Sequence, residues 1–159
     1  MCFVLDVNCV PTLFDPKSDG HNEFAPLLGW LFDHPNTCLV VGGEKYLKEL
    51  GFFKKYLSIF AELRRLNKIT KICSVAVDFE TQRIKAKNKH QDFDDEHLVA
   101  LLCASGCLVF ASKDKRADKF IKMKSLYTKA HTPPKIYRNE RHGKKLLCDQ
   151  NIATLKNTI

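Results

Sequence analysis

The chain has 159 residues, of which 45% are hydrophobic and 28% are charged. This length favours one domain, spanning residues 1–159, with a core of its own, and the ordinary composition excludes disorder as the default state. The formal net charge of +8 favours a nucleic acid or another polyanion as partner.

The cysteines and the apolar runs bear on the cellular compartment. Seven cysteines occur, an odd number without a C-x-x-C pair, so neither a disulfide framework nor a zinc site is predicted. Most of them lie in apolar runs, where cysteine acts as a small hydrophobic residue, and a reducing cytosol is expected. No basic segment precedes the first apolar run, and no run approaches the ~20 residues of a membrane span. A cytoplasmic protein without a membrane segment is therefore predicted.

The first half of the chain alternates short apolar runs with helical patterns. Residues 2–5 form a continuous apolar run that predicts a buried strand, and a helix is expected over residues 8–14. A short helix over residues 23–33 and a buried strand over residues 38–41, ended by two glycines, come next. Apolar residues at helical spacing then predict a long helix over residues 44–67, which Gly51 bends or splits.

The second half continues this alternation with a stronger basic character. Its expected elements are a strand at 72–77, a basic segment at 80–90, a helix at 94–106, a strand at 108–112, a helix near 115–127 and a short strand at 136–137. A basic C-terminal segment begins at about residue 128. Because apolar strands alternate with helices, a parallel sheet covered on both faces is expected. The predicted fold class is α/β, a three-layer α/β/α sandwich with a mostly parallel central sheet.

Two of the predicted strands lead directly into aspartates. Asp6 follows the first strand with Asn8 two residues later, and Asp114 follows the strand at 108–112 with Ser112 beside it. In an open parallel sheet, ligands bind at the carboxyl ends of the strands. The structural alternative for each aspartate is an Asx turn or a helix cap. A functional role is favoured for Asp6, and the two interpretations are equally supported for Asp114.

Further carboxylates are expected on helices that reach the same edge of the sheet. Asp94 and Asp95 begin the helix over residues 94–106 in phase with its apolar stripe, so both are expected to face the sheet edge. Acids at a helix start also act as caps or stabilise the helix dipole, which is the alternative here. Glu49 lies on the apolar stripe of the long helix and is preferred over Glu44 as a further acid.

Carboxylates gathered at one place repel one another unless a cation neutralises them. Oxygen ligands suit Mg²⁺ or Mn²⁺, and such an ion activates water and stabilises charge on a phosphodiester. The sequence therefore predicts a metal site on an otherwise basic chain. Its predicted ligands are Asp6, Asp94, Asp95 and Asp114, with Asp94 and Asp95 as alternative or joint ligands.

The acidic blocks also carry a resemblance to a known family. In chain order they are Leu5-Asp6-Val7-Asn8, Tyr46-Leu47-Lys48-Glu49-Leu50, Asp92-Phe93-Asp94-Asp95 leading into Leu98-Val99-Ala100-Leu101, and Ser112-Lys113-Asp114. In order and spacing these blocks resemble the PIN domain family of metal-dependent ribonucleases, and the resemblance covers residues 2–121. It implies a three-layer α/β/α fold, an Mg²⁺ or Mn²⁺ site and cleavage of single-stranded RNA that leaves a 3′-hydroxyl and a 5′-phosphate.

The resemblance also implies roles for particular residues and partners. Its implied catalytic acids are Asp6, Glu49, Asp95 and Asp114, with Asn8 and Ser112 in support. Many PIN-like proteins are toxins of toxin–antitoxin pairs, so a small antitoxin-type inhibitor protein and a homodimer are implied as partners. A catalytically inactive module that binds RNA or protein, and a nuclease that acts on DNA flaps or single strands, are the alternatives.

Basic residues surround the last of these acids. Lys113, Lys115, Arg116 and Lys119 are predicted to contact the phosphate backbone of a nucleic acid, with a solvated surface as the alternative. A further lysine cluster includes Lys89. His97, which is off the apolar stripe of its helix, is expected to be exposed.

Overall fold

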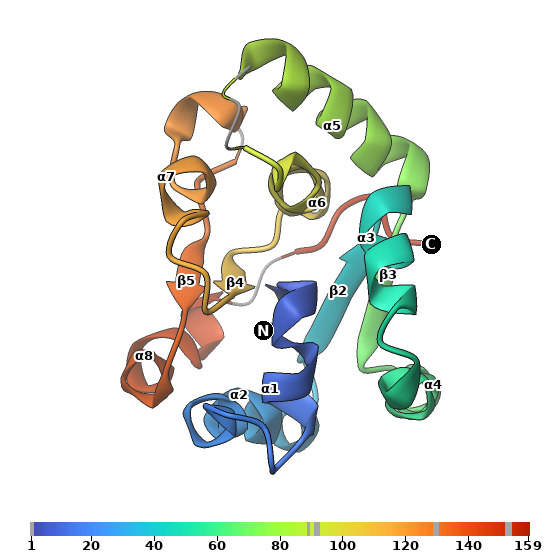
Figure 1. Cartoon of the computed structure of the whole chain (residues 1–159), viewed down its shortest axis with the longest axis vertical. Helices are drawn as coiled ribbons and strands as arrows, with labels where there is room; N and C mark the ends of the chain where they lie inside the picture. Colours follow the sequence, from blue (N-terminus) through green and yellow to red (C-terminus); the bar gives the residue numbers. More distant parts are fainter. Residues whose placement is uncertain (1, 89, 91–92, 129–130, 152–153) are drawn as a thin grey trace.

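A five-stranded parallel sheet forms the centre of the computed structural model, which describes residues 2–88, 90, 93–128, 131–151 and 154–159 (Figure 1). The strands are β1 (Cys2–Leu5), β2 (Cys38–Gly42), β3 (Ile69–Ile72), β4 (Val109–Ala111) and β5 (Lys135–Tyr137), in the spatial order β3-β2-β1-β4-β5. The three inner strands are completely buried, as their continuous apolar runs predict, and the two edge strands are partly exposed.

Helices cover both faces of the sheet, so the predicted three-layer α/β/α fold is confirmed (Figure 1). One face carries α1 (Val10–Phe14), α2 (His21–Asp33), α4 (Leu57–Arg65) and α8 (Glu140–Leu146), and the other carries α5 (Ser74–Lys87), α6 (Glu96–Ser105) and α7 (Asp118–Ile121). The chain changes face after β3 because right-handed crossovers that run in opposite directions place their helices on opposite sides. Between β2 and α4 lies α3 (Glu44–Gly51), and short 3₁₀ turns occupy Val7–Cys9, Lys54–Tyr56, Lys124–Leu126 and Asp149–Asn151.

Several predicted boundaries are wrong, and the clearest case is the third strand. The sequence predicts it at residues 72–77, but β3 ends at Ile72 and α5 begins at Ser74. The chain turns early because Asn67 adopts a left-handed conformation with φ of 55°, which asparagine tolerates better than most residues. The helix predicted over 44–67 is split after Gly51, as expected for that residue, whereas only α7 and a 3₁₀ turn form where a helix was predicted near 115–127.

Gly43 closes the turn between β2 and α3 and fixes how closely α5 approaches. Its φ is 80°, a conformation that side chains other than glycine rarely adopt. A Cβ atom at this position would lie 2.6 Å from Cγ1 of Val77 on α5. Gly43, the second of the two glycines that end the predicted strand, is therefore required by the backbone and by the packing of α5.

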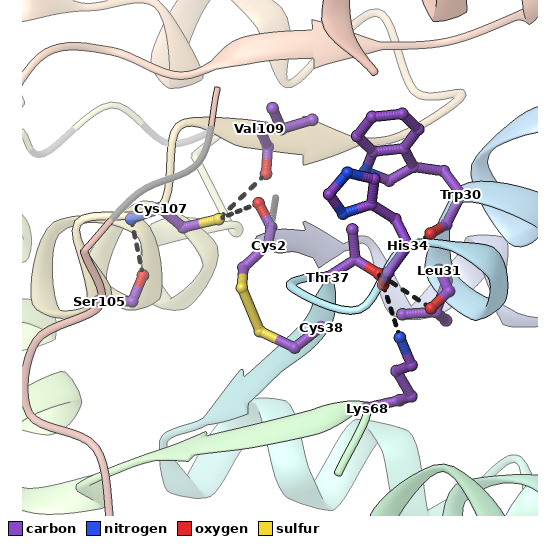
Figure 2. Close-up of a disulfide and its surroundings, with 10 residues drawn as sticks. All are labelled: Cys2, Trp30, Leu31, His34, Thr37, Cys38, Lys68, Ser105, Cys107 and Val109. Carbon is purple, nitrogen blue, oxygen red and sulfur yellow. Dashed lines mark hydrogen bonds between the residues drawn. A yellow bond between two sulfur atoms is a disulfide. The ribbon is translucent and has the colours of Figure 1, made fainter. Parts of the chain in front are cut away.

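One disulfide joins Cys2 and Cys38, which the cysteine pattern, predicting no disulfide framework, did not indicate (Figure 2). The two residues are register partners on β1 and β2, and their Cα atoms are 4.6 Å apart. Cysteine spacing does not reveal which cysteines become neighbours across a sheet. The five cysteines outside this bond are free, and one of them, Cys107, donates a hydrogen bond from its thiol to the Cys2 carbonyl at 3.0 Å. A stable disulfide is uncommon in a reducing compartment, so this bond weighs against the expected cytosolic location.

The basic C-terminal segment belongs to the sheet structure. It supplies β5 and α8, and its last residues return to the free edge of β3 (Figure 1). There the Cys73 amide donates to the Asn157 carbonyl at 2.7 Å, the Ile159 amide donates to the Lys71 carbonyl at 3.0 Å, and an antiparallel bridge pairs Ile72 with Thr158.

None of the helices in the described part of the chain is long and apolar enough to cross a membrane.

Candidate functional site

The candidate site lies where the order of the strands reverses. The connections that leave β1 and β4 run in opposite directions, because β2 lies on one side of this pair and β5 on the other. Such a switch point leaves a crevice at the carboxyl ends of the two strands, which is where ligands bind in open α/β sheets. Asp6 directly follows β1, and Ser112 directly follows β4.

A pocket of about 670 Å³ opens at this point. Its lining residues are Asp6, Asn8, Asp94, Asp95, Asp114, Lys115, Arg116, Ala117, Lys119 and Phe120. The structure therefore brings together most of the residues predicted from the sequence. Glu49, Ser112 and Lys113 do not line the pocket.

Asp6 is held rigidly at the base of the pocket. Its Oδ1 accepts a hydrogen bond from the Asn8 amide at 3.0 Å, and its Oδ2 accepts one from the Ser112 hydroxyl at 2.8 Å. Asp6 thus caps the 3₁₀ turn that follows β1 and also lines the pocket, so the two interpretations of this residue are compatible. Burial raises the pKa of Asp6, and the hydrogen bonds from Ser112 and Asn8 oppose that rise.

Ser112 connects two of the acids without lining the pocket itself. Its side chain is completely buried, donates to Asp6 as described, and accepts a hydrogen bond from the Asp114 amide at 3.0 Å. The hydroxyl therefore ties the end of β1 to the turn after β4. The supporting role predicted for Ser112 corresponds to this position.

Asp95 precedes α6 as its N-cap residue, but its side chain makes no capping hydrogen bond. The capping alternative is therefore not realised for this residue. Asp95 is half-buried, and burial together with the nearby carboxylates of Asp6 and Asp114 raises its pKa to about 6. Asp94 also lines the pocket but is exposed. Asp92, the third aspartate of this block, and Lys89 lie outside the described residues.

Asp114 is engaged by a neighbouring arginine. The Arg116 guanidinium donates to both carboxylate oxygens, with Nη2 2.8 Å from Oδ2 and Nε 3.1 Å from Oδ1, and the Arg116 amide donates to Oδ1 at 2.8 Å. These contacts lower the pKa of Asp114. Asp114 does not cap the next helix, since the N-cap of α7 is Ala117.

Glu49 does not line the pocket and is paired with a histidine. Its Oε2 lies 3.0 Å from Nε2 of His97 on α6. The prediction that His97 is exposed is wrong, because only 3% of its surface is accessible. Every residue of α6 is buried, since α5 covers the side of the helix that was expected to face solvent. Glu44, the alternative acid, is exposed and does not line the pocket.

The basic residues divide into two groups. Lys115, Arg116 and Lys119 line the pocket, whereas Lys113 turns away and donates to the Asp19 carbonyl at 3.2 Å. Sequence reasoning missed Lys45 on α3, whose ammonium donates to the Asp94 carbonyl at 2.6 Å. The local sequence around Lys45 does not indicate this contact, because it depends on how α3 packs against the segment before α6.

The donor set of the pocket fits Mg²⁺ or Mn²⁺ in chemical type, because it consists of carboxylate oxygens with a buried aspartate among them. Within the described residues, however, no group of three or more histidine, cysteine, aspartate or glutamate side chains is arranged to hold a metal ion. Both carboxylate oxygens of Asp114 face the guanidinium of Arg116.

No protein-family model, curated protein or solved structure matches this chain. The resemblance to PIN domains stays a prediction from the residues.

Proposed function

We propose that the protein is an Mg²⁺- or Mn²⁺-dependent endoribonuclease that cleaves single-stranded RNA, as the resemblance to PIN domains implies. The observation that supports the proposal best is the pocket at the switch point. Asp6, Asp95 and Asp114 come from segments far apart in the sequence and line the same 670 Å³ cavity, next to Lys115, Arg116 and Lys119. Acids surrounded by basic residues suit a substrate whose phosphates must approach a metal site.

The carboxylates of the pocket differ in their affinity for protons. Asp114 is held ionised by Arg116, whereas the pKa of Asp95 is raised to about 6 by burial and by neighbouring carboxylates. The raised pKa of Asp95 reflects burial and repulsion between carboxylates, which a bound cation would relieve, so we place Asp95 among the metal ligands. A bound Mg²⁺ or Mn²⁺ would supply Lewis acidity and neutralise charge at the phosphodiester. The residues proposed to hold it are Asp6, Asp94, Asp95 and Asp114.

The decisive test compares Asp6→Asn and Asp95→Asn with the wild type on a labelled single-stranded RNA, in Mn²⁺ and in EDTA. We expect Mn²⁺-dependent cleavage by the wild type and its loss in both variants. Asp149→Asn is the matched control, because the side chain of Asp149 is 78% exposed and pairs with His34 outside the pocket. Full cleavage by both site variants would rule out the assignment.

A non-catalytic RNA-binding module is the second candidate, and two contacts favour it. Glu49 is hydrogen-bonded to His97 and Asp114 is paired with Arg116, so two of the predicted acids already have side-chain partners. Such a module would bind RNA with a strong dependence on salt but would not cleave it in Mn²⁺. Competition between RNA and DNA oligonucleotides of the same sequence separates both candidates from a DNA-directed nuclease.

The toxin role that the resemblance implies rests on the proposed nuclease activity. Expression in bacteria would then arrest growth, and Asp95→Asn would relieve the arrest. A small protein that restores growth when co-expressed with the wild type would be the proposed antitoxin-type partner. Size measurement in solution tests the proposed homodimer.

A further inference from the structure

Arg116 makes an unusually complete contact for a surface side chain. The guanidinium reaches both oxygens of Asp114 through Nε and Nη2, and the Arg116 amide donates to the same carboxylate. Both residues line the pocket. The arginine therefore directs its positive charge at one of the acids proposed to hold the metal.

The side chain of Arg116 is nevertheless 91% exposed, while that of Asp114 is 30% exposed. A contact between an exposed arginine and a carboxylate is weak, because water solvates both partners and holding the long side chain in place loses entropy. Arg138 offers a contrast within the same region. It pairs with Asp118, but its side chain is only 15% exposed, so it is fixed in the fold. Arg116 is thus the arginine of the pocket that is able to leave its partner.

The carboxylate of Asp114 can serve one cation at a time through these oxygens. An ion that used both of them would have to displace the guanidinium, and the released arginine would remain at the rim beside Lys115 and Lys119. A planar guanidinium is well suited to bind a phosphate through two parallel hydrogen bonds.

We propose that Arg116 occupies the carboxylate of Asp114 in place of the metal, and that metal binding releases it to bind a phosphate of the RNA backbone. The inference rests on the proposed function, because it requires that Asp114 belongs to a metal site. It adds a coupling between metal binding and substrate binding, in which one residue serves as competitor for the first and ligand for the second. In this scheme Arg116 binds the substrate directly and takes no part in proton transfer.

The test measures Mn²⁺ binding by calorimetry on the full chain, without RNA. Arg116→Ala is compared with Lys115→Ala, which removes the same charge from the same pocket but leaves the contact with Asp114 intact. Loss of any positive charge tightens cation binding somewhat, so the quantity of interest is the excess in Arg116→Ala over Lys115→Ala. From the strength of exposed ion pairs, we expect Arg116→Ala to bind Mn²⁺ about two- to fivefold more tightly than Lys115→Ala.

A second measurement follows the arginine itself. The Nε–H resonance of Arg116, assigned by its absence in Arg116→Ala, is recorded in ¹⁵N-labelled protein during addition of Mg²⁺. We expect it to move toward the position of exposed arginines as Mg²⁺ binds, and to stay unchanged in Asp6→Asn, in which Arg116 and Asp114 are both intact. Arg116→Lys retains the charge without the planar donor pair, so its Mn²⁺ affinity is expected to lie between those of wild type and Arg116→Ala.

The possible outcomes separate this inference from the proposed function. Suppose that the wild type binds Mn²⁺ but Arg116→Ala binds it no more tightly than Lys115→Ala does, or the Nε–H resonance does not move. Either result would overturn the role of Arg116 and leave the metal site in place. Mn²⁺ binding by Arg116→Ala, without detectable binding by the wild type or Lys115→Ala, would support the inference most strongly. Absence of binding in all variants would overturn both.

Discussion

The carboxylate of Glu49 on α3 lies 3.0 Å from Nε2 of His97 on α6, and this contact joins two helices that pack against each other. Burial lowers the pKa of His97 although Glu49 opposes the shift, so the neutral ring donates its Nε2 proton to the carboxylate. Within the described residues, Nδ1 of His97 is buried without a hydrogen-bond partner. The position of this histidine therefore depends strongly on Glu49.

Replacing His97 is expected to destabilise the fold markedly. His97→Ala removes a buried ring and leaves a cavity between α3 and α6, so we expect a loss of about 2–3 kcal/mol in the free energy of unfolding, measured with urea. Glu49→Gln keeps an oxygen acceptor for Nε2 and is expected to lose less than about 1 kcal/mol. Glu62→Gln, which alters the exposed pair with Arg65, is the control and should change little. An equal loss in His97→Ala and Glu62→Gln would contradict this role of the histidine.

Asp95 is expected to destabilise the metal-free protein at neutral pH. Its pKa is raised from 3.8 to about 6, so the folded state binds the proton more tightly than the unfolded state does. The stabilising effect of protonation is complete below about pH 4 and is lost as the pH rises to about 6. Asp95→Asn should therefore be more stable than the wild type at about pH 7.5, by about 1 kcal/mol after allowance for solvent screening.

The difference in the free energy of unfolding between Asp95→Asn and the wild type should vanish at about pH 4, where Asp95 is protonated in the folded wild type and is neutral like the asparagine. Urea unfolding in EDTA at the two pH values measures it. Asp94→Asn, next to Asp95 but exposed, is the control variant. A variant that is less stable than the wild type at about pH 7.5 would show that the Asp95 carboxylate is stabilised by its surroundings.

The disulfide between Cys2 and Cys38 is expected to stabilise the fold without affecting the pocket. It links residues 36 positions apart, and loss of a crosslink over a loop of this length costs about 3–4 kcal/mol in the chain-entropy model. The bond lies at the start of β1 and β2, whereas the pocket lies at the carboxyl end of β1. We expect a reductant to lower the melting temperature and leave Mn²⁺ affinity unchanged at a temperature where the reduced protein is folded.

Alkylation under denaturing conditions provides the accompanying check on this bond. Mass measurement should find five reactive thiols before reduction and seven after it. Seven thiols in the unreduced protein would show that Cys2 and Cys38 are not joined.

Two glycines provide a matched pair of alanine substitutions. Gly43→Ala introduces a Cβ 2.6 Å from Val77 at a φ of 80°, so we expect a loss of about 1–3 kcal/mol in the free energy of unfolding. Gly51→Ala meets nothing within 4 Å at the last residue of α3 and is expected to gain up to about 1 kcal/mol. Urea unfolding of both variants tests this, and a neutral Gly43→Ala would show that α5 shifts to accommodate the methyl group.

The sequence was most informative where local pattern and tertiary position coincide. The apolar runs before Asp6 and Ser112 identified two inner strands, and the parallel arrangement of those strands brings the residues that follow them to the same edge. This is why Asp6 and Asp114 were found as neighbours. Asp94 and Asp95 do line the pocket, but they precede α6, so helical phase did not determine where they point.

The remaining features depend on packing between segments distant in the sequence. The burial of His97 follows from α5 covering α6, and the Cys2–Cys38 bond follows from the register of β1 and β2. Neither is encoded in a local pattern. The strand at 72–77 is predicted from apolar residues alone, whereas Asn67, whose residue type tolerates a left-handed conformation, precedes the strand that forms at 69–72.

The last residues of the chain, which return to β3, also protect the protein from aggregation in concentrated solution. An exposed edge strand offers a row of free amide and carbonyl groups to which a strand of another molecule can add. Residues 157–159 satisfy part of that row on β3, and Lys71 adds a charge at the same edge. A version shortened before residue 154 would present this edge to other molecules and would be prone to aggregation for a reason unrelated to the pocket.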